Sequence, residues 1–494
     1  MTILKIENNY SWVLTENDEL KTLLWKAMRH KARNYFHNAR YKMKLWDGYD
    51  EYFKRDSGRF LTGLLPEVAQ AIAHVKVPYE VDDRRNKVQF AYDVIGEDFL
   101  NNWAPAGESG VKLRDYQVEY INQAIKHKRG IITSPTGSGK TNCLIGILKA
   151  LGGDVPTLVL ANKKSLVEQN YKEIMKWGFV NVGRFYSDYK EPNMITCSTV
   201  QSAHLLKPIL PKIKVLIVDE VHEMMSRQPK AIYSALKACS VRIGMSATAM
   251  KFGGTDRSQK FDVKGWIGPV FMLNDESNPS GKLTTKELQE RDILSHATNY
   301  FIRVTKPRLD YEIYMDAVTK GIAENDHFHD MVAALVKPLP GRTLIIVDRL
   351  EHGERLRQRL PDAEWVRGED SMSAREMVIE RLKTEKKVVA IATAGIFNTG
   401  INVFCHTLVN AAGGQADHQI VQRYGRGLRV TKDKDGLLYF DFLFENNEYL
   451  QKHSNKRVKI LEKEGHIIQI LDEDVVFTPA PPWASGASEP GVPG

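Results

Sequence analysis

The sequence predicts an α/β protein with two parallel sheets in tandem, preceded by a small α+β module. The first observation is a series of short apolar runs separated by helix-length segments, at residues 130–134, 157–161, 215–220 and 241–248. A second series of the same kind lies at residues 342–347, 388–393, 407–411 and 437–440. Runs of this length are typical of buried parallel strands joined by helices. The third observation is a mixed, aromatic-rich stretch before these two series.

Changes in amino-acid composition and hydrophobic pattern along the chain give the expected domain boundaries. An accessory module covers residues 1–105 and ends in a linker that contains proline and glycine. The first α/β domain covers residues 106–300 and the second covers residues 301–477. The tail at 478–494 is rich in proline, glycine and serine, so we expect it to be disordered.

The composition excludes several classes of protein. Of the 494 residues, 43% are hydrophobic and 26% charged, which is ordinary for globular domains and excludes global disorder. No secretory signal and no run of about 18 apolar residues is visible, so neither secretion nor a membrane span is expected. Four separated cysteines argue against structural zinc and disulfides and favour a cytoplasmic protein. The net charge of +8 permits nucleic-acid binding, and with no mark of an oligomer a monomer is the working expectation.

A phosphate-binding loop follows the first apolar run. Residues 134–141 read S-P-T-G-S-G-K-T and precede a helical run. Glycines let backbone N–H groups turn inward around phosphate oxygens, and a helix N-terminus adds positive charge. Lys140 is expected to bridge the β- and γ-phosphates of a nucleotide, and the Thr141 hydroxyl to hold Mg²⁺. The other loop residues expected to contact the nucleotide are Thr136, Gly137, Ser138 and Gly139.

Two adjacent carboxylates end the apolar run at 215–218. Buried carboxylates are costly without a cation, so Asp219 and Glu220 at the end of a core strand indicate a metal site. We expect Asp219 to complete the Mg²⁺ shell and Glu220 to orient and deprotonate an attacking water. His222 either couples this site to others or fills the core. An acid pair that caps a helix is the alternative interpretation.

In this order, the motifs over residues 113–429 resemble those of superfamily 2 helicases of the DExH type. The segment L-R-D-Y-Q at 113–117 resembles the one whose glutamine recognises adenine, which implies nucleotide contacts for Arg114 and Gln117. The S-A-T at 246–248 resembles the element that links hydrolysis to domain motion. The resemblance implies two RecA-like domains, ATP and Mg²⁺ as cofactors, and ATP hydrolysis coupled to DNA unwinding.

Two motifs of the second domain complete the resemblance. Residues 393–402 resemble the motif that touches both nucleic acid and nucleotide, which implies that Gly400 lies at the nucleotide; Asn402 stands where many relatives have Asp. Residues 422–429 match Q-x-x-G-R-x-x-R, which implies catalytic roles for Gln422, Arg426 and Arg429. The two arginines are three residues apart on one helical face, so both can point at a transferring phosphoryl group. A solvated basic face is the alternative.

Loops at strand ends are expected to contact nucleic acid. The resemblance assigns this role to Lys163, Thr199 and Gln201 in the first domain and to Thr393 and Asn398 in the second. The alternatives are plain surface charge for the lysine and turn formation for the small polar residues.

The N-terminal module indicates the kind of helicase. Residues 40–49 and 58–66 resemble the N-terminal module of the UvsW-type phage recombination and branch-migration helicases. This implies forks and Holliday junctions as substrates, roles in recombination, replication-fork processing and repair, and the host-cell cytoplasm for a phage-encoded chain. Basic groups neutralise phosphates and aromatic faces stack on bases, which gives Lys42, Lys44 and Trp46 as DNA contacts. The alternative is a half-buried strand at 41–46 with its lysines facing outward.

Two later segments have two interpretations each. Residues 430–437 predict a hairpin that is either a strand-separating wedge or a plain edge hairpin. Residues 448–464 predict a helix whose basic residues either lie along phosphates or form a solvated face: Lys452, His453, Lys456, Arg457, Lys459 and Lys463.

Three alternative functions stay open at this point. A duplex DNA translocase would move without separating strands, an RNA helicase would act on RNA, and a scaffold would use ATP only as a clamp signal. Glu220 and the arginine motif argue against the scaffold, because a clamp does not need a complete hydrolysis site.

Overall fold

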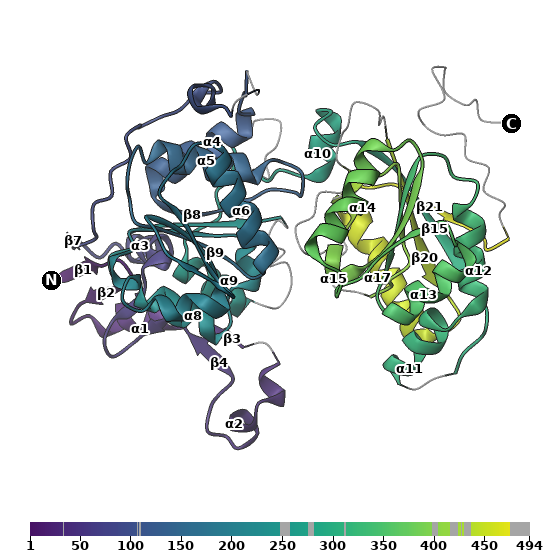
Figure 1. Cartoon of the computed structure of the whole chain (residues 1–494). Coiled ribbons are helices and arrows are strands. Elements are labelled where there is room, and N and C mark those ends of the chain that lie inside the picture. Colours follow the sequence, from purple (N-terminus) through teal and green to yellow (C-terminus); the bar gives the residue numbers. More distant parts are fainter. Residues whose placement is uncertain are drawn as a thin grey trace, which may run out of the picture. The chain divides into compact units, whose positions relative to one another are not determined.

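The structure is a computed structural model, and its elements are shown in Figure 1. It describes residues 1–32, 34–105, 107, 110–247, 257–274, 281–310, 313–397, 404–414, 423–425, 427–428 and 436–474. The chain forms two compact units. Unit 1 comprises Met1–Ser134 and Gly139–Lys282, and unit 2 comprises Leu283–Gly494 together with Pro135–Ser138. Each unit is built on its own parallel sheet.

The N-terminal part of unit 1 is a five-stranded sheet with two helices. The strands alternate buried and partly exposed residues, as expected of a sheet with one face on a core. The strand order is β5-β6-β2-β1-β7, with β1 antiparallel to β2 and parallel to β7. The elements are β1 (Thr2–Ile6), β2 (Tyr10–Leu14), α1 (Asp18–Ala27), β5 (Phe53–Lys54), β6 (Arg59–Leu61), α3 (Leu65–His74) and β7 (Tyr79–Asp83).

A small projection leaves this sheet between α1 and β5. Its stem is the antiparallel pair β3 (Arg29–Lys31) and β4 (Tyr49–Glu51). Its tip contains a 3₁₀ turn, Tyr35–His37, and the short helix α2 (Ala39–Lys42). Figure 1 shows α2 at the end of this projection, away from the sheets of unit 1. We call residues 29–51 the projection.

The main sheet of unit 1 has seven strands in the order β11-β10-β12-β9-β13-β14-β8. All neighbours are parallel except the edge pair β10 and β11, so the carboxyl ends of the other strands meet at one edge. The strands are β8 (Arg129–Thr133), β9 (Thr157–Ala161), β10 (Val182–Tyr186), β11 (Tyr189–Glu191), β12 (Ile195–Thr199), β13 (Val215–Val218) and β14 (Val241–Ser246). The helices are α4 (Asp115–His127), α5 (Lys140–Ala150), α6 (Lys164–Lys176), α7 (Val200–Ala203), α8 (Arg227–Ala235) and α9 (Arg257–Trp266).

The two sheets of unit 1 share one hydrophobic core. Buried residues of the N-terminal sheet, such as Leu4 and Phe53, belong to the same cluster as Leu216 of β13 and Ile267 after α9. The hydroxyl of Tyr52 also donates to the carbonyl of Ser258 on α9, at 2.6 Å. The N-terminal sheet is therefore packed into the first α/β domain.

Unit 2 is a seven-stranded, all-parallel sheet in the order β17-β18-β16-β19-β20-β15-β21. Its strands are β15 (His296–Val304), β16 (Arg342–Val347), β17 (Glu364–Val366), β18 (Val388–Thr393), β19 (Thr407–Asn410), β20 (Gly436–Phe444) and β21 (Ile468–Leu471). Its helices are α10 (Thr285–Glu290), α11 (Tyr314–Val318) with a π-helical continuation (Thr319–Ala323), α12 (Asp326–Val336), α13 (Leu350–Arg359), α14 (Met372–Thr384), α15 (Ala394–Phe397) and α17 (Glu448–Lys463).

The predicted fold class is confirmed: two parallel-sheet α/β domains follow a small α+β sheet. The units divide the chain at residues 282 and 283, and β15 runs through the position at which the sequence analysis separated the two domains. Among the described residues, no helix is long and apolar enough to cross a membrane. All four cysteines are buried free thiols.

Two sequence interpretations are wrong in detail. Residues 41–46 do not form a half-buried strand, because α2 ends at Lys42 and Lys44 has a left-handed φ of 57°. On α17, Arg457 neither follows phosphates nor faces solvent. It is fully buried against Asp441. Most of the predicted hairpin at 430–437 lies outside the described residues.

Candidate nucleotide-binding and hydrolysis site

The phosphate loop joins β8 to α5, as predicted. Gly137 and Gly139 have φ values of 87° and 82°, a left-handed conformation that L side chains rarely adopt. A side chain at Gly139 would also meet the amide nitrogen of Gln117. Lys140 is the first residue of α5, and its ammonium donates to the carbonyl of Ser134 at 2.8 Å. The ammonium is thus held against the loop that would wrap the phosphates.

The predicted adenine-recognition segment is attached directly to this loop. Gln117 lies in the first turn of α4 and is 1% exposed. Its side-chain oxygen accepts from the backbone N–H of Arg114 at 2.9 Å, and its amide donates to the carbonyl of Gly139 at 3.3 Å. The Arg114 guanidinium donates to the hydroxyl of Tyr116 at 3.2 Å. Gln117 therefore links the start of α4 to the end of the phosphate loop.

The acidic pair lies at the carboxyl end of β13, on the same sheet edge as the phosphate loop. Asp219 accepts from the backbone N–H of Glu220 at 3.0 Å, and Glu220 has a left-handed φ of 48°. Burial and the charge of Glu220 raise the pKa of Asp219 to about 6, whereas the positive charge of Lys140 opposes this rise. The carboxylate and the ammonium are therefore close enough to interact, in a place where a bare negative charge is unfavourable.

Glu220 is connected to the S-A-T segment. Its carboxylate accepts from the backbone N–H of Ala247 at 3.2 Å and lies 3.5 Å from Nδ1 of His222. The same His222 nitrogen is 2.9 Å from the hydroxyl oxygen of Ser246. His222 thus contacts both the acidic pair and the end of β14, as the coupling interpretation requires.

The residues present suit Mg²⁺ better than a metal held by protein alone. Within the described ranges there is no group of three or more His, Cys, Asp and Glu residues that could hold a metal ion. Mg²⁺ in nucleotide sites is usually held by one or two protein oxygens together with substrate phosphates. Asp219, whose ionised form is disfavoured by burial, and Thr141 on the first turn of α5 are a donor set of this kind.

Three predicted nucleic-acid residues also lie at this sheet edge. Lys163 follows β9 and is the N-cap of α6, while Thr199 ends β12 and Gln201 lies in α7. Thr199 pairs in register with Ala161, so the chain leaves β9 and β12 at adjacent positions. In unit 2, Thr393 ends β18.

The projection carries the other predicted DNA contacts. Lys42 and Lys44 are exposed, and within the described part of the chain neither they nor Arg40 has a carboxylate within ion-pair distance. Trp46 is half-buried and donates its indole N–H to the carbonyl of Tyr49 at 2.8 Å. Lys42, Lys44 and Trp46 border a hollow that extends to Lys230 of α8 and Asp262 of α9.

Several predicted site residues lie outside the described residues: Asn398, Gly400, Gln422, Arg426 and Arg429. Conversely, the sequence analysis missed Asn170, a buried residue of α6 whose side chain lowers the pKa of Asp219. It also missed Tyr120, whose hydroxyl donates to the carbonyl of Thr133 at the end of β8. Neither residue belongs to a motif, so its role could not be predicted from the sequence.

Comparisons with known proteins find relatives that are named as DNA helicases and translocases. Residues 110–251 match the family described as "Type III restriction enzyme, res subunit". The DNA 3'-5' translocase XPB2 of Sulfurisphaera tokodaii is 26% identical over 369 residues, which cover 68% of this chain and 82% of the relative. The ATP-dependent DNA helicase uvsW of Enterobacteria phage T4 is 21% identical over 441 residues, which cover 84% of each chain.

A solved structure has the same fold. The fragment of a putative HsdR subunit of a type I restriction enzyme from Vibrio vulnificus YJ016 matches with a TM-score of 0.53 at 19% identity. The match covers 77% of this chain and 72% of that one. The ordered motifs, the two parallel-sheet domains and these relatives together show that the chain is similar to superfamily 2 helicases, with a resemblance to the UvsW-type enzymes.

Proposed function

We propose that this chain is an ATP-dependent DNA helicase that unwinds or branch-migrates forked and Holliday-junction DNA. The observation that carries the ATPase part is the buried Asp219 carboxylate, which interacts with Lys140 at the foot of a phosphate loop. A carboxylate whose ionised form is disfavoured gains most from a divalent cation, and a nucleotide's phosphates supply the remaining ligands of that cation.

Each residue of this site has a distinct proposed role. Lys140 exchanges its bond to the Ser134 carbonyl for the β- and γ-phosphates of ATP. Thr141 and Asp219 would hold Mg²⁺, which neutralises charge on the phosphates. Glu220 takes the proton of the attacking water. Gln422, Arg426 and Arg429 are proposed, from their motif alone, to neutralise the transferring phosphoryl group.

Gln117 and His222 are proposed to transmit changes at the nucleotide site to the segments that they contact. Gln117 is bonded both to the start of α4 and to the carbonyl of Gly139, so it can read the base while holding the loop. His222 bonds the end of β14 and faces Glu220, so hydrolysis can alter the S-A-T segment that follows.

The DNA part of the proposal rests on the shared sheet edge. The phosphate loop, the acidic pair, Lys163 and Thr199 all follow the carboxyl ends of strands in one parallel sheet. A change in nucleotide state can therefore alter the grip on a strand over a short distance. The two α/β domains would hold the strand alternately, with affinities that differ between nucleotide states.

Branched DNA is proposed as the substrate because of the projection. Arg40, Lys42 and Lys44 are exposed cations without carboxylate partners among the described residues, and Phe36 beside them is 52% exposed. Cations bind phosphates and aromatic faces stack on unpaired bases, and a branch point presents both. Recombination, fork processing and repair, in the cytoplasm of a host cell for a phage-encoded chain, are the processes this substrate implies.

The test is ATP turnover on a panel of nucleic acids, with strand release measured in parallel. The panel holds single-stranded DNA, blunt duplex, a fork, a four-way junction and RNA, with Lys140→Ala as the inactive control. Strongest turnover and strand release on forks and junctions support the proposal. Equal turnover on blunt duplex without strand release supports instead the translocase function named for the XPB2 relative. Stimulation by RNA alone overturns the DNA claim.

A further inference from the structure

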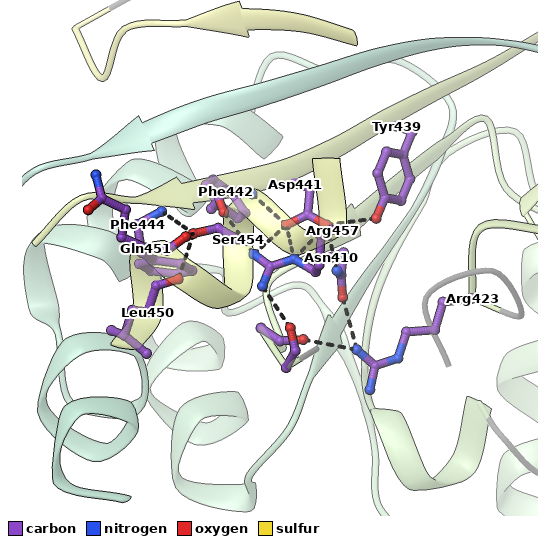
Figure 2. A network of polar contacts seen from close by, with 12 residues as sticks. Asn410, Arg423, Tyr439, Asp441, Phe442, Phe444, Leu450, Gln451, Ser454 and Arg457 are labelled. Atoms are coloured by element: carbon purple, nitrogen blue, oxygen red, sulfur yellow. Dashed lines mark hydrogen bonds and ion pairs between the residues drawn. The ribbon is translucent and has the colours of Figure 1, made fainter. Parts of the chain in front are cut away.

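A buried polar network in unit 2 includes Arg423, the second residue of the arginine motif (Figure 2). Its centre is Asp441 on β20, which is fully buried. The Asp441 carboxylate accepts from the guanidinium of Arg457 on α17 at 2.9 to 3.2 Å. It also accepts from the side-chain amide of Asn410 at 2.8 Å and from the hydroxyl of Tyr439 at 2.8 Å.

The network reaches the arginine motif through Arg423. The Arg423 guanidinium donates to the side-chain oxygen of Asn410 at 3.3 Å and to the carbonyl of Gly413 at 3.4 Å. From the other side, Arg457 donates to the carbonyl of Gly414 at 2.9 Å. Two arginines therefore hold the segment that follows β19. Arg423 and Arg457 are both labelled in Figure 2, and Arg423 directly follows Gln422 in the sequence.

The next residue is held by the same network. The ring of Tyr424 packs edge-on against the ring of Tyr439, with centroids 5.0 Å apart. Tyr439 is the residue whose hydroxyl is bonded to Asp441, and burial together with that carboxylate raises its pKa well above the ordinary value. Arg423 and Tyr424, two of the three described residues at the start of the motif, are thus each in contact with a residue that is bonded to Asp441.

The buried charges of this network indicate a role beyond packing. Arg457 and Asp441 already form a complete buried pair, yet Arg423 adds a second buried guanidinium that has no carboxylate within ion-pair distance among the described residues. Its Nε–H is also without a hydrogen-bond partner in that part of the chain. A buried charge of this kind is costly, and a hydrophobic side chain would pack more favourably.

We infer that Asp441, Asn410 and Tyr439 are positioning residues for ATP hydrolysis. They contact Arg423 and Tyr424, and Arg426 follows two residues after Tyr424 in the sequence. The inference rests on the proposed function, because it gives these residues the role of positioning Arg426, which is proposed to neutralise the transferring phosphoryl group. A displacement of about 1 Å in a group that acts on the transition state can lower turnover by up to about a hundredfold.

The test compares the removal of two buried hydrogen-bonding groups of unit 2, one inside the Asp441 network and one outside it. Asn410→Ala removes the link between Asp441 and Arg423 but leaves the Asp441–Arg457 pair in place. The matched control is Ser454→Ala, also buried, whose hydroxyl bonds the backbone of Phe444 and Leu450 and does not touch Arg423 (Figure 2). Steady-state kcat and KM for ATP and the melting temperature are measured for both.

Asn410→Ala is expected to lower kcat by about tenfold or more with KM for ATP nearly unchanged. Ser454→Ala is expected to keep kcat near the wild-type value, even if its melting temperature falls as far as that of Asn410→Ala. Tyr439→Phe, which keeps the ring contact with Tyr424, is expected to give a smaller loss of kcat than Asn410→Ala. A folded Asn410→Ala protein with wild-type kcat overturns the inference, as does an equal loss in the Ser454 control.

The proposed function and this inference fail in different ways. If the wild-type protein hydrolyses no ATP with any nucleic acid, the proposed function is wrong and the positioning role falls with it. If the wild type turns over and Asn410→Ala does so equally fast, only the positioning role is wrong.

Discussion

Arg129 and Arg242 are register partners at the start of the adjacent parallel strands β8 and β14, and both guanidiniums donate to the carbonyl of Trp266. Trp266 is the last residue of α9, so its carbonyl lies at the negative end of that helix. Arg129 also donates to the carbonyl of Asn8 at 2.6 Å, and Arg242 to the side chain of Asn9. Both buried guanidiniums thus donate to carbonyls and to the first turn of the N-terminal sheet, whereas Nε of Arg242 has no hydrogen-bond partner among the described residues.

This connection predicts that Arg129 is needed for stability rather than for catalysis. Arg129→Met leaves the buried carbonyls of Asn8 and Ile267 without their donor, so the free energy of unfolding should fall by about 2 to 4 kcal/mol. ATP turnover per folded molecule should change little. Denaturant unfolding and steady-state kinetics check the two parts. Wild-type stability of this variant would contradict the account.

Deletion of the N-terminal sheet is predicted to unfold unit 1. The N-terminal sheet shares its core with β13, and Asn8 and Asn9 also donate to the carbonyls of Lys237 and Ser234. A chain without residues 1–84 should therefore lose the cooperative melting transition of unit 1. Calorimetry of the truncated and full-length proteins makes the comparison, and an unchanged transition would show that the sheet is dispensable.

Substrate preference is accordingly tested by charge reversal on the projection. Lys42→Glu removes an exposed cation without touching the core, so affinity for forks and junctions should fall by about tenfold. The salt dependence of binding should also become shallower. The control is Lys26→Glu, an exposed lysine at the end of α1. Equal loss of binding in both variants would mean that only net charge matters.

Substitution of Asp219 is predicted to have opposite effects on stability and on activity. Its pKa is raised to about 6 in the folded protein, against about 3.9 when unfolded. Between these values the folded state keeps a proton that the unfolded state has lost, so stability without nucleotide should fall as the pH rises from about 4 to 6. Asp219→Asn should recover up to about 3 kcal/mol at pH 8 while abolishing ATP hydrolysis.

Melting curves from pH 4 to pH 8, without nucleotide, check this prediction. Asp188→Asn, at an exposed turn beside β11, is the control for the removal of one negative charge. A destabilised Asp219→Asn protein at pH 8 would contradict the burial argument.

Substitution of Gln117 is predicted to impair nucleotide recognition. Gln117→Ala removes the donor to the Gly139 carbonyl and the acceptor for the Arg114 N–H. KM for ATP should rise by about tenfold with a smaller change in kcat, and selectivity for ATP over GTP should fall. Gln123→Ala on the same helix, which contacts the carbonyl of Met272 instead, should leave KM unchanged. Unaltered selectivity in Gln117→Ala would remove the adenine role.

Much of this architecture could be predicted from the sequence because local patterns determine it. The strands β16 and β18 have the predicted bounds, since each is a buried apolar run between polar turns. The phosphate loop and the acidic pair depend on contiguous residues and follow the same rule.

The parts that could not be predicted depend on contacts between distant residues. Asn8 and Arg129 are 121 positions apart, and nothing near either one indicates the other. Asp441 stands within an apolar strand and meets Arg457 only because α17 returns over β20. At residues 41–46 the alternation resembles a strand, but the Asn38 side chain caps α2 by accepting from the N–H of Arg40.

Fork-stimulated ATP hydrolysis with simultaneous strand release is the measurement that tests the central claim most directly. The wild-type protein should hydrolyse ATP faster with a fork or four-way junction than with blunt duplex, and should release a strand from the branched substrates. In Lys140→Ala, both ATP hydrolysis and strand release should be lower by a factor of about a thousand or more. Hydrolysis without strand release from any DNA, or strand release that survives in Lys140→Ala, would contradict the account.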